Sequence, residues 1–155
     1  MKDVSTMKEI LDYAAQTYKD SPAIRYKKKK EIITKTYNEL HRDSQAVSRA
    51  LDSLGMLGSH VAVIGPTTYE WIVSYFGAAN SGCVVVPLDA QLPAADVCEL
   101  LNRADISVLV YDELRKDVAA MAAETVPGLK YMISMQNEED TKQALSLHRH
   151  LENHA

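Results

Sequence analysis

Apolar and polar residues follow two different periods along this chain, and the switches between them mark its elements. From Met7 to Tyr18 the apolar residues recur every three or four positions, which is typical of an amphipathic helix. Thr6 and Glu9 have the spacing of a capping box in front of this stretch, and Ser21-Pro22 ends it. The first predicted element is therefore a helix with one buried face.

Two short β-rich runs come next, at residues 23–26 and 31–34, and four consecutive lysines separate them. This pattern predicts a β-hairpin whose turn, Lys27 to Lys30, is solvated. The lysines are few, no aromatic residues alternate with them, and the chain as a whole is acidic. We therefore assign them no nucleic-acid or lipid role.

A second helix is predicted from Tyr37 to Leu54, because a capping-box pattern at Thr36 and Glu39 precedes an apolar stripe. Gly55 follows this stretch, at the position where a residue in the left-handed conformation commonly ends a helix.

From Val61 onward, short β-branched runs alternate with amphipathic stretches. The predicted strands are residues 61–64, 83–86, 106–110 and 131–133, and Pro87 is expected to end the second of them. The helices between them are expected to begin at a Thr67–Glu70 capping box, near Pro93, and at Asp112. The third of these helices is expected to contain Leu114, Val118 and Met121. This alternation predicts an α/β fold, with an N-terminal hairpin and a mainly parallel sheet covered by helices on both faces.

The predicted domain organisation is one α/β subdomain over residues 1–135 and a polar tail over 136–155. Residues 136–140 are expected to form a loop, and Thr141 to Leu151 a short, loosely packed and mobile helix.

Composition and charge argue against some classes of function, nucleic-acid binding and membrane spanning among them. The 155 residues are 46% hydrophobic and 25% charged, with a formal net charge of −4, which disfavours nucleic acid as the partner. No apolar run is long enough to cross a bilayer, and the first residues lack the apolar core of a signal peptide, so the expected location is the cytoplasm. Cys83 and Cys98 belong to no CxxC pair and are expected to be buried free thiols.

Three loops follow predicted strands, at residues 65–68, 87–90 and 111–112, where α/β proteins usually carry function. The first is neither GxGxxG nor a Walker loop, so a turn with a helix cap is the preferred interpretation. Asp89 has no partner carboxylate or histidine near it in sequence, and a structural hydrogen bond is expected. His41 and His60 stand alone, and the pair His150 and His154 is too small a ligand set for a zinc site. The sequence thus yields no catalytic, cofactor-binding or metal residue.

The order of several local patterns resembles the AMP-forming adenylate-forming enzymes, which include acyl-CoA synthetases, luciferases and adenylation domains. The resemblance covers roughly residues 5–135. Four stretches carry it: Asp20-Ser21-Pro22-Ala23-Ile24, Thr36-Tyr37-Asn38-Glu39-Leu40, residues 54–72 and residues 78–89. Ser59 stands where the family usually has Asp, and Asn80 where it often has Lys.

The resemblance implies the N-terminal subdomain of an acyl-CoA synthetase. Such an enzyme forms an acyl-adenylate and pyrophosphate from ATP and a carboxylic acid, and coenzyme A then displaces AMP. The family's phosphate loop, magnesium-coordinating Glu and catalytic Lys lie downstream of the matched stretch. ATP, Mg²⁺ and coenzyme A are therefore expected for the full-length enzyme only, and this chain alone is expected to be inactive.

The expected partner is the remainder of the same polypeptide, and a face left uncovered could also drive self-association. Three alternatives stay open at this point. The chain could be a stand-alone α/β interaction module, or part of an adenylation domain or fatty acyl-AMP ligase. A dinucleotide-binding or flavodoxin-like domain is disfavoured, because no glycine-rich phosphate turn follows the first strand.

Overall fold

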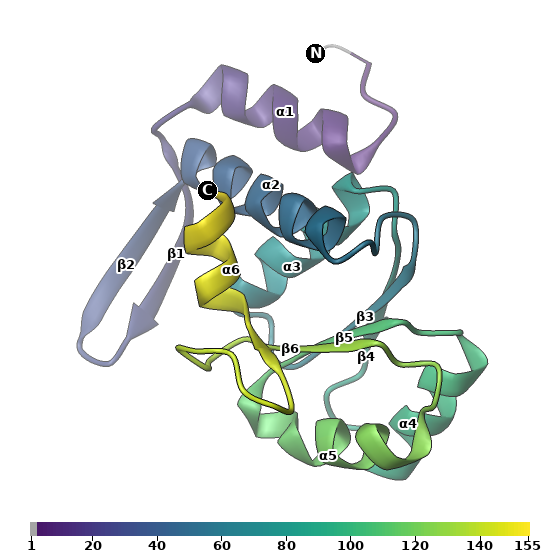
Figure 1. Cartoon of the computed structure of the whole chain (residues 1–155). Coiled ribbons are helices and arrows are strands. Elements are labelled where there is room, and N and C mark those ends of the chain that lie inside the picture. Colours follow the sequence, from purple (N-terminus) through teal and green to yellow (C-terminus); the bar gives the residue numbers. More distant parts are fainter. Residues whose placement is uncertain (1–2) are drawn as a thin grey trace.

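A parallel five-stranded sheet lies at the centre of the computed structural model, which describes residues 3–155 (Figure 1). Its strand order is β4-β3-β5-β6-β7, and every neighbouring pair is parallel. The strands are β3 (His60–Ile64), β4 (Val84–Leu88), β5 (Val108–Tyr111), β6 (Tyr131–Ser134) and β7 (Leu145–Ser146). The predicted α/β fold with a parallel sheet and an N-terminal hairpin is confirmed.

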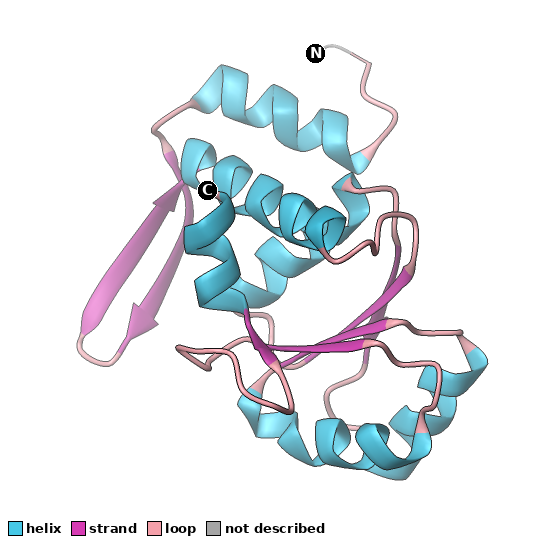
Figure 2. Ribbon diagram, in the orientation of Figure 1, coloured by secondary structure: helices cyan, strands magenta, loops and turns pink. Residues whose placement is uncertain are grey.

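Helices cover both faces of the sheet (Figure 2). Alternate residues of β3 serve the two sides, since Val61 and Val63 join one core cluster and Ala62 and Ile64 the other. The first cluster is shared with α1 (Met7–Tyr18), α2 (Tyr37–Ser53), α3 (Tyr69–Asn80) and α6 (Leu147–His154). The second is shared with α4 (Ala94–Arg103) and α5 (Lys116–Thr125).

The first two helices begin as their capping patterns predict. Thr6 Oγ1 accepts the Glu9 N–H at 3.1 Å, and Thr36 Oγ1 accepts the Glu39 N–H at 3.1 Å. The Glu39 carboxylate returns the bond by accepting the Thr36 N–H at 2.8 Å. Each box satisfies N–H groups that would otherwise lack a partner in the first helical turn.

The predicted hairpin consists of β1 (Pro22–Lys28) and β2 (Glu31–Thr36), paired antiparallel. The turn is shorter than the predicted Lys27 to Lys30, because Lys27 and Lys28 pair as part of β1. Lys29 and Lys30 alone form it, and Lys29 has a φ of +56°. The hairpin stands apart from the main sheet and projects beside α2 and α6 (Figure 1).

The prediction that Pro87 ends its strand is wrong, because β4 continues to Leu88 and Pro87 pairs with Val63. The Val84 N–H donates to the Ser59 carbonyl at 3.0 Å. Since N–H groups alternate in direction along a strand, the nitrogen of Pro87 faces away from β3. β4 is an edge strand, where a missing donor on the outer side removes no ladder bond.

The tail differs from its prediction as well. A helix was expected from Thr141, but residues 145–146 form β7 and α6 begins only at Leu147, capped by Ser146. Thr141 instead closes a turn, accepting the Ala144 N–H at 3.1 Å. Leu147 is 3% exposed, so the tail contributes to the core on α2. Its mobility stays a prediction.

The helix predicted to begin at Asp112 is divided into two parts. A 3₁₀ turn, η1 (Glu113–Arg115), precedes α5, so Leu114 lies outside the periodic face of the helix and is 71% exposed. Val118 and Met121 both lie in α5; Val118 is fully buried, whereas Met121 is 36% exposed. No helix among the described residues is long and apolar enough to cross a membrane.

Candidate functional site

The loops after β3, β5 and β6 meet at the carboxyl edge of the sheet, where α/β proteins usually hold ligands. Asp112, directly after β5, is 4% exposed. Its Oδ1 accepts the Leu114 N–H at 2.9 Å, and its Oδ2 accepts Gln136 Nε2 at 2.8 Å. The Asp112 N–H donates to the Ile64 carbonyl at 3.0 Å. Asp112 therefore ties three strand ends together, and both of its carboxylate oxygens are engaged.

The loop after β3 passes so close to Asp112 that only glycine fits there. Gly65 has a φ of +147°, and a Cβ at this position would lie 2.5 Å from the Cβ of Asp112. The loop that we considered as an anion site is thus held against its neighbour by backbone packing.

Thr68, rather than Thr67, caps the helix that follows this loop. Thr68 Oγ1 accepts the Trp71 N–H at 3.2 Å and α3 begins at Tyr69. The predicted Thr67–Glu70 capping box is therefore wrong by one residue. Thr67 lies in a tight turn before the helix, in which the Thr68 N–H donates to the Pro66 carbonyl at 2.8 Å.

The third strand-end loop lies apart from this cluster. Asp89 follows the edge strand β4, is exposed, and accepts the Gln91 N–H at 2.8 Å through Oδ1. This bond is the local structural role that was expected of it, an Asx-type turn.

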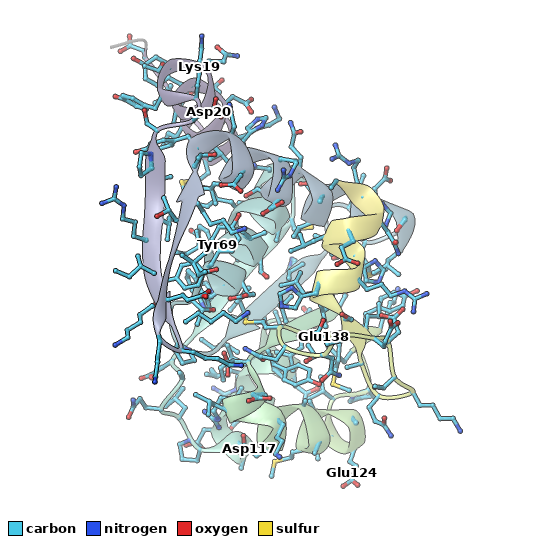
Figure 3. All side chains as sticks on the ribbon, turned by 90° about the vertical axis from the view of Figure 1, so that its left-hand side faces the viewer. Lys19, Asp20, Tyr69, Asp117, Glu124 and Glu138 are labelled. Carbon is cyan, nitrogen blue, oxygen red and sulfur yellow. The ribbon has the colours of Figure 1, made fainter. Side chains whose placement is uncertain are left out.

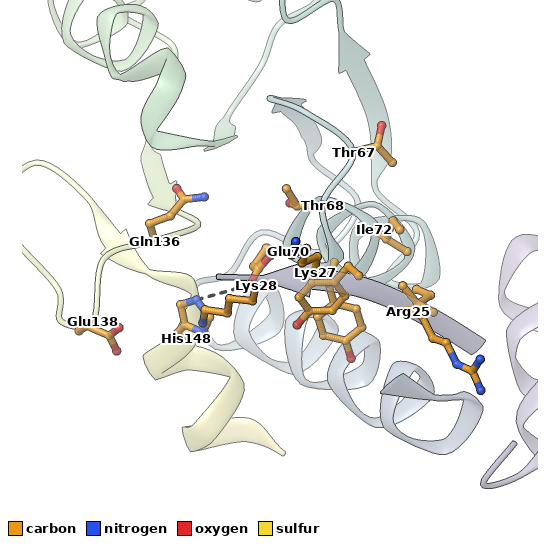
Figure 4. A pocket seen from close by; sticks show the side chains of 13 residues that line it. Arg25, Lys27, Lys28, Thr67, Thr68, Glu70, Ile72, Gln136, Glu138 and His148 are labelled. Atoms are coloured by element: carbon orange, nitrogen blue, oxygen red, sulfur yellow. Dashed lines mark ion pairs between the residues drawn. The ribbon is translucent and has the colours of Figure 1, made fainter. Parts of the chain in front are cut away.

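A groove runs between the hairpin, the start of α3 and the segment that leads into α6 (Figure 4). Its cavity volume is about 450 Å³. The hairpin side is formed by residues 24–28 of β1, and the opposite side by residues 67–70, Gln136, Glu138 and His148. A second hollow of about 410 Å³ adjoins it and shares Tyr26, Lys28, Tyr69, Glu70 and His148. Figure 3 shows Tyr69 beside the hairpin.

Tyr69 anchors the floor of this groove. Its hydroxyl donates to the buried Asp43 Oδ2 at 2.5 Å, and its ring stacks on Tyr26 with centroids 6.1 Å apart. Burial, and after it the Asp43 carboxylate, raise the pKa of the Tyr69 hydroxyl far above its usual range. Tyr69 is thus a neutral hydrogen-bond donor at any physiological pH, and it has a structural role here.

The histidines contact different neighbouring groups and are not arranged as a metal site among the described residues. His41 Nε2 lies 2.7 Å from Asp12 Oδ1 and joins α1 to α2, so His41 is not the isolated residue that we expected. His60 Nδ1 lies 2.7 Å from the Ala104 carbonyl. The rings of His150 and His154 stack 5.8 Å apart. Within residues 3–155 no three His, Cys, Asp or Glu side chains are arranged to hold a metal ion.

The two cysteines are free thiols, as expected, with Cys98 buried and Cys83 half-buried. Neither lies in the groove. The groove therefore offers hydrogen bonds, aromatic surface and charge for binding, and we assign it no nucleophile.

The family model of the AMP-binding enzymes matches residues 11–153. This chain belongs to the AMP-binding enzyme family. The match covers nearly the whole described chain, including the tail that we had set apart at residue 136.

Two relatives that match most of this chain are fatty-acid ligases by name. The fatty acid–[acyl-carrier-protein] ligase ScoC of Streptomyces coeruleorubidus is 31% identical over 131 residues, 81% of this chain. The long-chain-fatty-acid–CoA ligase 5 of Rattus norvegicus is 26% identical over 147 residues, 89% of this chain. These matches cover only 24% and 21% of the two relatives, so the chain spans about a quarter of their length.

Solved structures show the same fold. The N-terminal domain of FACL13 from Mycobacterium tuberculosis has a TM-score of 0.81 and 22% identity, covering 98% of this chain and 36% of that one. Acetoacetyl-CoA synthetase from Streptomyces lividans has a TM-score of 0.85 and 22% identity, covering 97% and 25%. The fold therefore matches that of the N-terminal domain of these enzymes.

Sequence reasoning missed two residues that organise the site. Asp43 lies three residues after Leu40 and four before Val47, on the apolar stripe of α2, and a carboxylate in that position signals a buried partner. Gln136, which accepts the Glu113 N–H at 2.8 Å as well as donating to Asp112, was assigned only to a polar loop. Its sequence context carries no signal for that role.

Proposed function

We propose that this chain supplies the N-terminal part of an ATP-dependent, AMP-forming ligase that joins a fatty acid to coenzyme A. The family match over residues 11–153 carries the proposal. The substrate class rests on the names of the relatives, since a long-chain-fatty-acid–CoA ligase and a fatty acid–[acyl-carrier-protein] ligase are both similar to most of this chain.

The reaction of such an enzyme has two steps. The carboxylate of the acid attacks the α-phosphate of ATP, which releases pyrophosphate and leaves an acyl-adenylate. The thiol of the acceptor then attacks the acyl carbonyl and releases AMP. Because ScoC by its name uses a carrier protein, transfer to a carrier thiol is the second candidate, with the same first step.

The described residues do not fit the Mg²⁺ that the reaction requires. Both oxygens of Asp112 accept hydrogen bonds from within the fold, and the described residues hold no carboxylate cluster for a metal ion. We therefore assign no catalytic step to this chain. Its proposed contribution is structural, namely the sheet and helices on which the rest of such an enzyme would pack.

A chimera tests this proposal directly. The stretch of ScoC that matches this chain is replaced by the chain, and pyrophosphate release is measured with ATP, Mg²⁺ and a fatty acid. We expect the chimera to release pyrophosphate, and the isolated chain to release none and to bind no ATP in titration calorimetry.

The control is the same chimera carrying Val47→Asp, which places a charge in the helix-packing core and should abolish release. A chimera that folds, as judged by its circular dichroism and melting, yet releases no pyrophosphate would contradict the proposal. It would favour a stand-alone interaction module instead. Turnover by the isolated chain would mean that the strand-end loops carry chemistry.

A further inference from the structure

The imidazole ring of His150, on α6, is enclosed without hydrogen bonds. Both ring nitrogens are buried, and neither has a hydrogen-bond partner among the residues that the structure describes. A neutral imidazole carries one donor and one acceptor, and a folded protein normally satisfies such groups when it buries them. The ligase function proposed above gives this histidine no role.

Residues of this part of the chain themselves enclose the ring. The His150 side chain is 15% exposed, and its ring stacks on that of His154, with centroids 5.8 Å apart. The helix that carries both rings packs against α2 (Figure 1). Because the two nitrogens are already buried, polypeptide outside residues 3–155 cannot reach them unless α6 moves first. Their lack of partners is therefore a property of the described fold.

Asp140 is the acid within ion-pair range of this ring, but it is already engaged. Asp140 Oδ1 lies 4.0 Å from His150 Nε2, too far for a hydrogen bond, and it accepts the Ser146 N–H at 2.7 Å. The neighbouring Glu139 is bound through Oε2 to Arg149 Nη1 at 2.7 Å. A shift of Asp140 toward Nε2 would still leave Nδ1 without an acceptor.

The surroundings of the ring therefore fit its neutral form better than its cation. Burial lowers the pKa of His150, and the charges of His154 and Arg149 act in the same direction, with Asp140 against them. The cation has two N–H donors to satisfy, one more than the neutral ring. Once His154 is charged as well, two like charges lie four residues apart on one helix, which destabilises it further.

The two halves of α6 are held by different contacts. At its beginning, Leu147 is 3% exposed in the core, and His148 Nε2 lies 3.8 Å from Glu70 Oε1 on α3. Protonation of His148 strengthens that pair, so acid holds this half in place. Near the other end, Arg49 Nε on α2 donates to the His154 carbonyl at 2.6 Å, a contact that protonation does not strengthen.

We propose that His150 makes the contact between α6 and α2 sensitive to pH: when its ring gains a proton, residues 150–154 separate from α2, while the beginning of the helix stays docked. The cation then reaches water, and the bond from Arg49 is broken. This inference goes beyond the ligase function and uses no residue to which that function assigns a role. Polypeptide packed on the outer side of α6 would oppose the movement without changing its direction with pH.

The pH range follows from the two states of the ring. An exposed histidine has a pKa of about 6.5, and the enclosed ring has a lower one. The open arrangement therefore binds the proton more tightly, so opening increases as the pH falls below about 6.5 and levels off below the pKa of the enclosed ring.

Hydrogen exchange of the backbone amides tests this in the intact chain at pH 7 and pH 5, with each rate divided by the intrinsic rate at that pH. A released helical segment this short is not stable in water, so we expect the protection of residues 151–154 to fall about tenfold. The strands β3 and β5 should keep their protection. An equal loss in these strands would mean that the whole protein unfolds, and would overturn the proposal.

Two substitutions at this position separate charge from packing. His150→Phe keeps a ring and gives up no hydrogen bond, so the segment should stay protected at both pH values. His150→Lys carries the charge at both, and its protection at pH 7 should already be about tenfold below that of the unaltered chain. Protection that still falls in His150→Phe would refute the proposal, and this variant decides the matter alone if His150→Lys does not fold.

His148→Gln is the matched control on the same helix. It removes a titrating histidine that pairs with Glu70 and lies in the half that stays docked. We expect the loss of protection at residues 151–154 to persist in this variant. If it disappeared in His148→Gln, the proton would act at position 148 and the assignment to His150 would be wrong.

Discussion

Gly77 of α3 packs directly against Val47 of α2, with no room for a side chain between them. A Cβ at Gly77 would overlap the Val47 side chain and lie 2.8 Å from the Ser44 carbonyl oxygen. The close approach also lets Ser48 Oγ donate to the Gly77 carbonyl at 2.7 Å. The two helices can therefore cross at this distance only because position 77 is glycine.

Gly77→Ala should accordingly destabilise the protein. Alanine favours a helix over glycine by up to about 1 kcal/mol, but overpacking a tight contact costs about 1–3 kcal/mol, so the net effect is a loss. Gly128→Ala is the matched control, since a Cβ there meets nothing within 4 Å. Chemical denaturation measures both, and equal stability of the two variants would refute the packing argument.

Asp112 and Asp89 both follow strands of the sheet, but only Asp112 is buried and bonded to other loops. Asp112→Ala leaves the Gln136 amide and the Leu114 N–H without their acceptor, which should cost about 1–3 kcal/mol of unfolding free energy. Asp89→Ala removes one exposed turn bond and should cost less than about 1 kcal/mol. We expect the lower melting temperature for Asp112→Ala. A lower melting temperature for Asp89→Ala would contradict the structural role assigned to Asp112.

The start of α3 can be tested by two neighbouring threonines. Thr68→Ala removes the N-cap acceptor and should cost about 1 kcal/mol, whereas Thr67→Ala should be close to neutral. Urea denaturation of the two variants compares them directly. A larger loss at Thr67 would restore the capping box that the sequence alone suggested.

Acidification should weaken the attachment of α6. Burial lowers the pKa of His150 in the folded protein, with His154 and Arg149 acting in the same direction and Asp140 against them. The unfolded chain therefore takes up this proton first, and stability falls as the pH drops below about 6.5, levelling off below the folded pKa. The variant His150→Gln should lose less stability between pH 7 and pH 5 in thermal melts. Parallel pH profiles for both proteins would contradict this assignment.

Most of the fold follows from local patterns. The capping boxes at Thr6 and Thr36 and the β-branched runs of β3 and β5 are signals that act over a few residues, and the structure keeps them. Pro87 misled the prediction, because only the position of β4 at the sheet edge makes a proline harmless there.

The structure of residues 141–146, in contrast, could not be predicted from local sequence. Leu145 and Ser146 form only two residues of strand, and they do so because β6 offers an edge beside them. Nothing within their own sequence distinguishes them from a polar helix. The groove is non-local for the same reason, since its walls come from residues 24–28 and 67–70 and from Gln136, Glu138 and His148.

α1 and α6 both pack on α2, so the covering of α2 is completed in two steps as the chain is synthesised. α2 is covered by α1, which is made before it, and by α6, which is made about a hundred residues later. Arg49 Nε on α2 donates to the His154 carbonyl at 2.6 Å. One flank of α2 must therefore wait for residues 147–154 to leave the ribosome, and until then it is a surface that a chaperone can recognise.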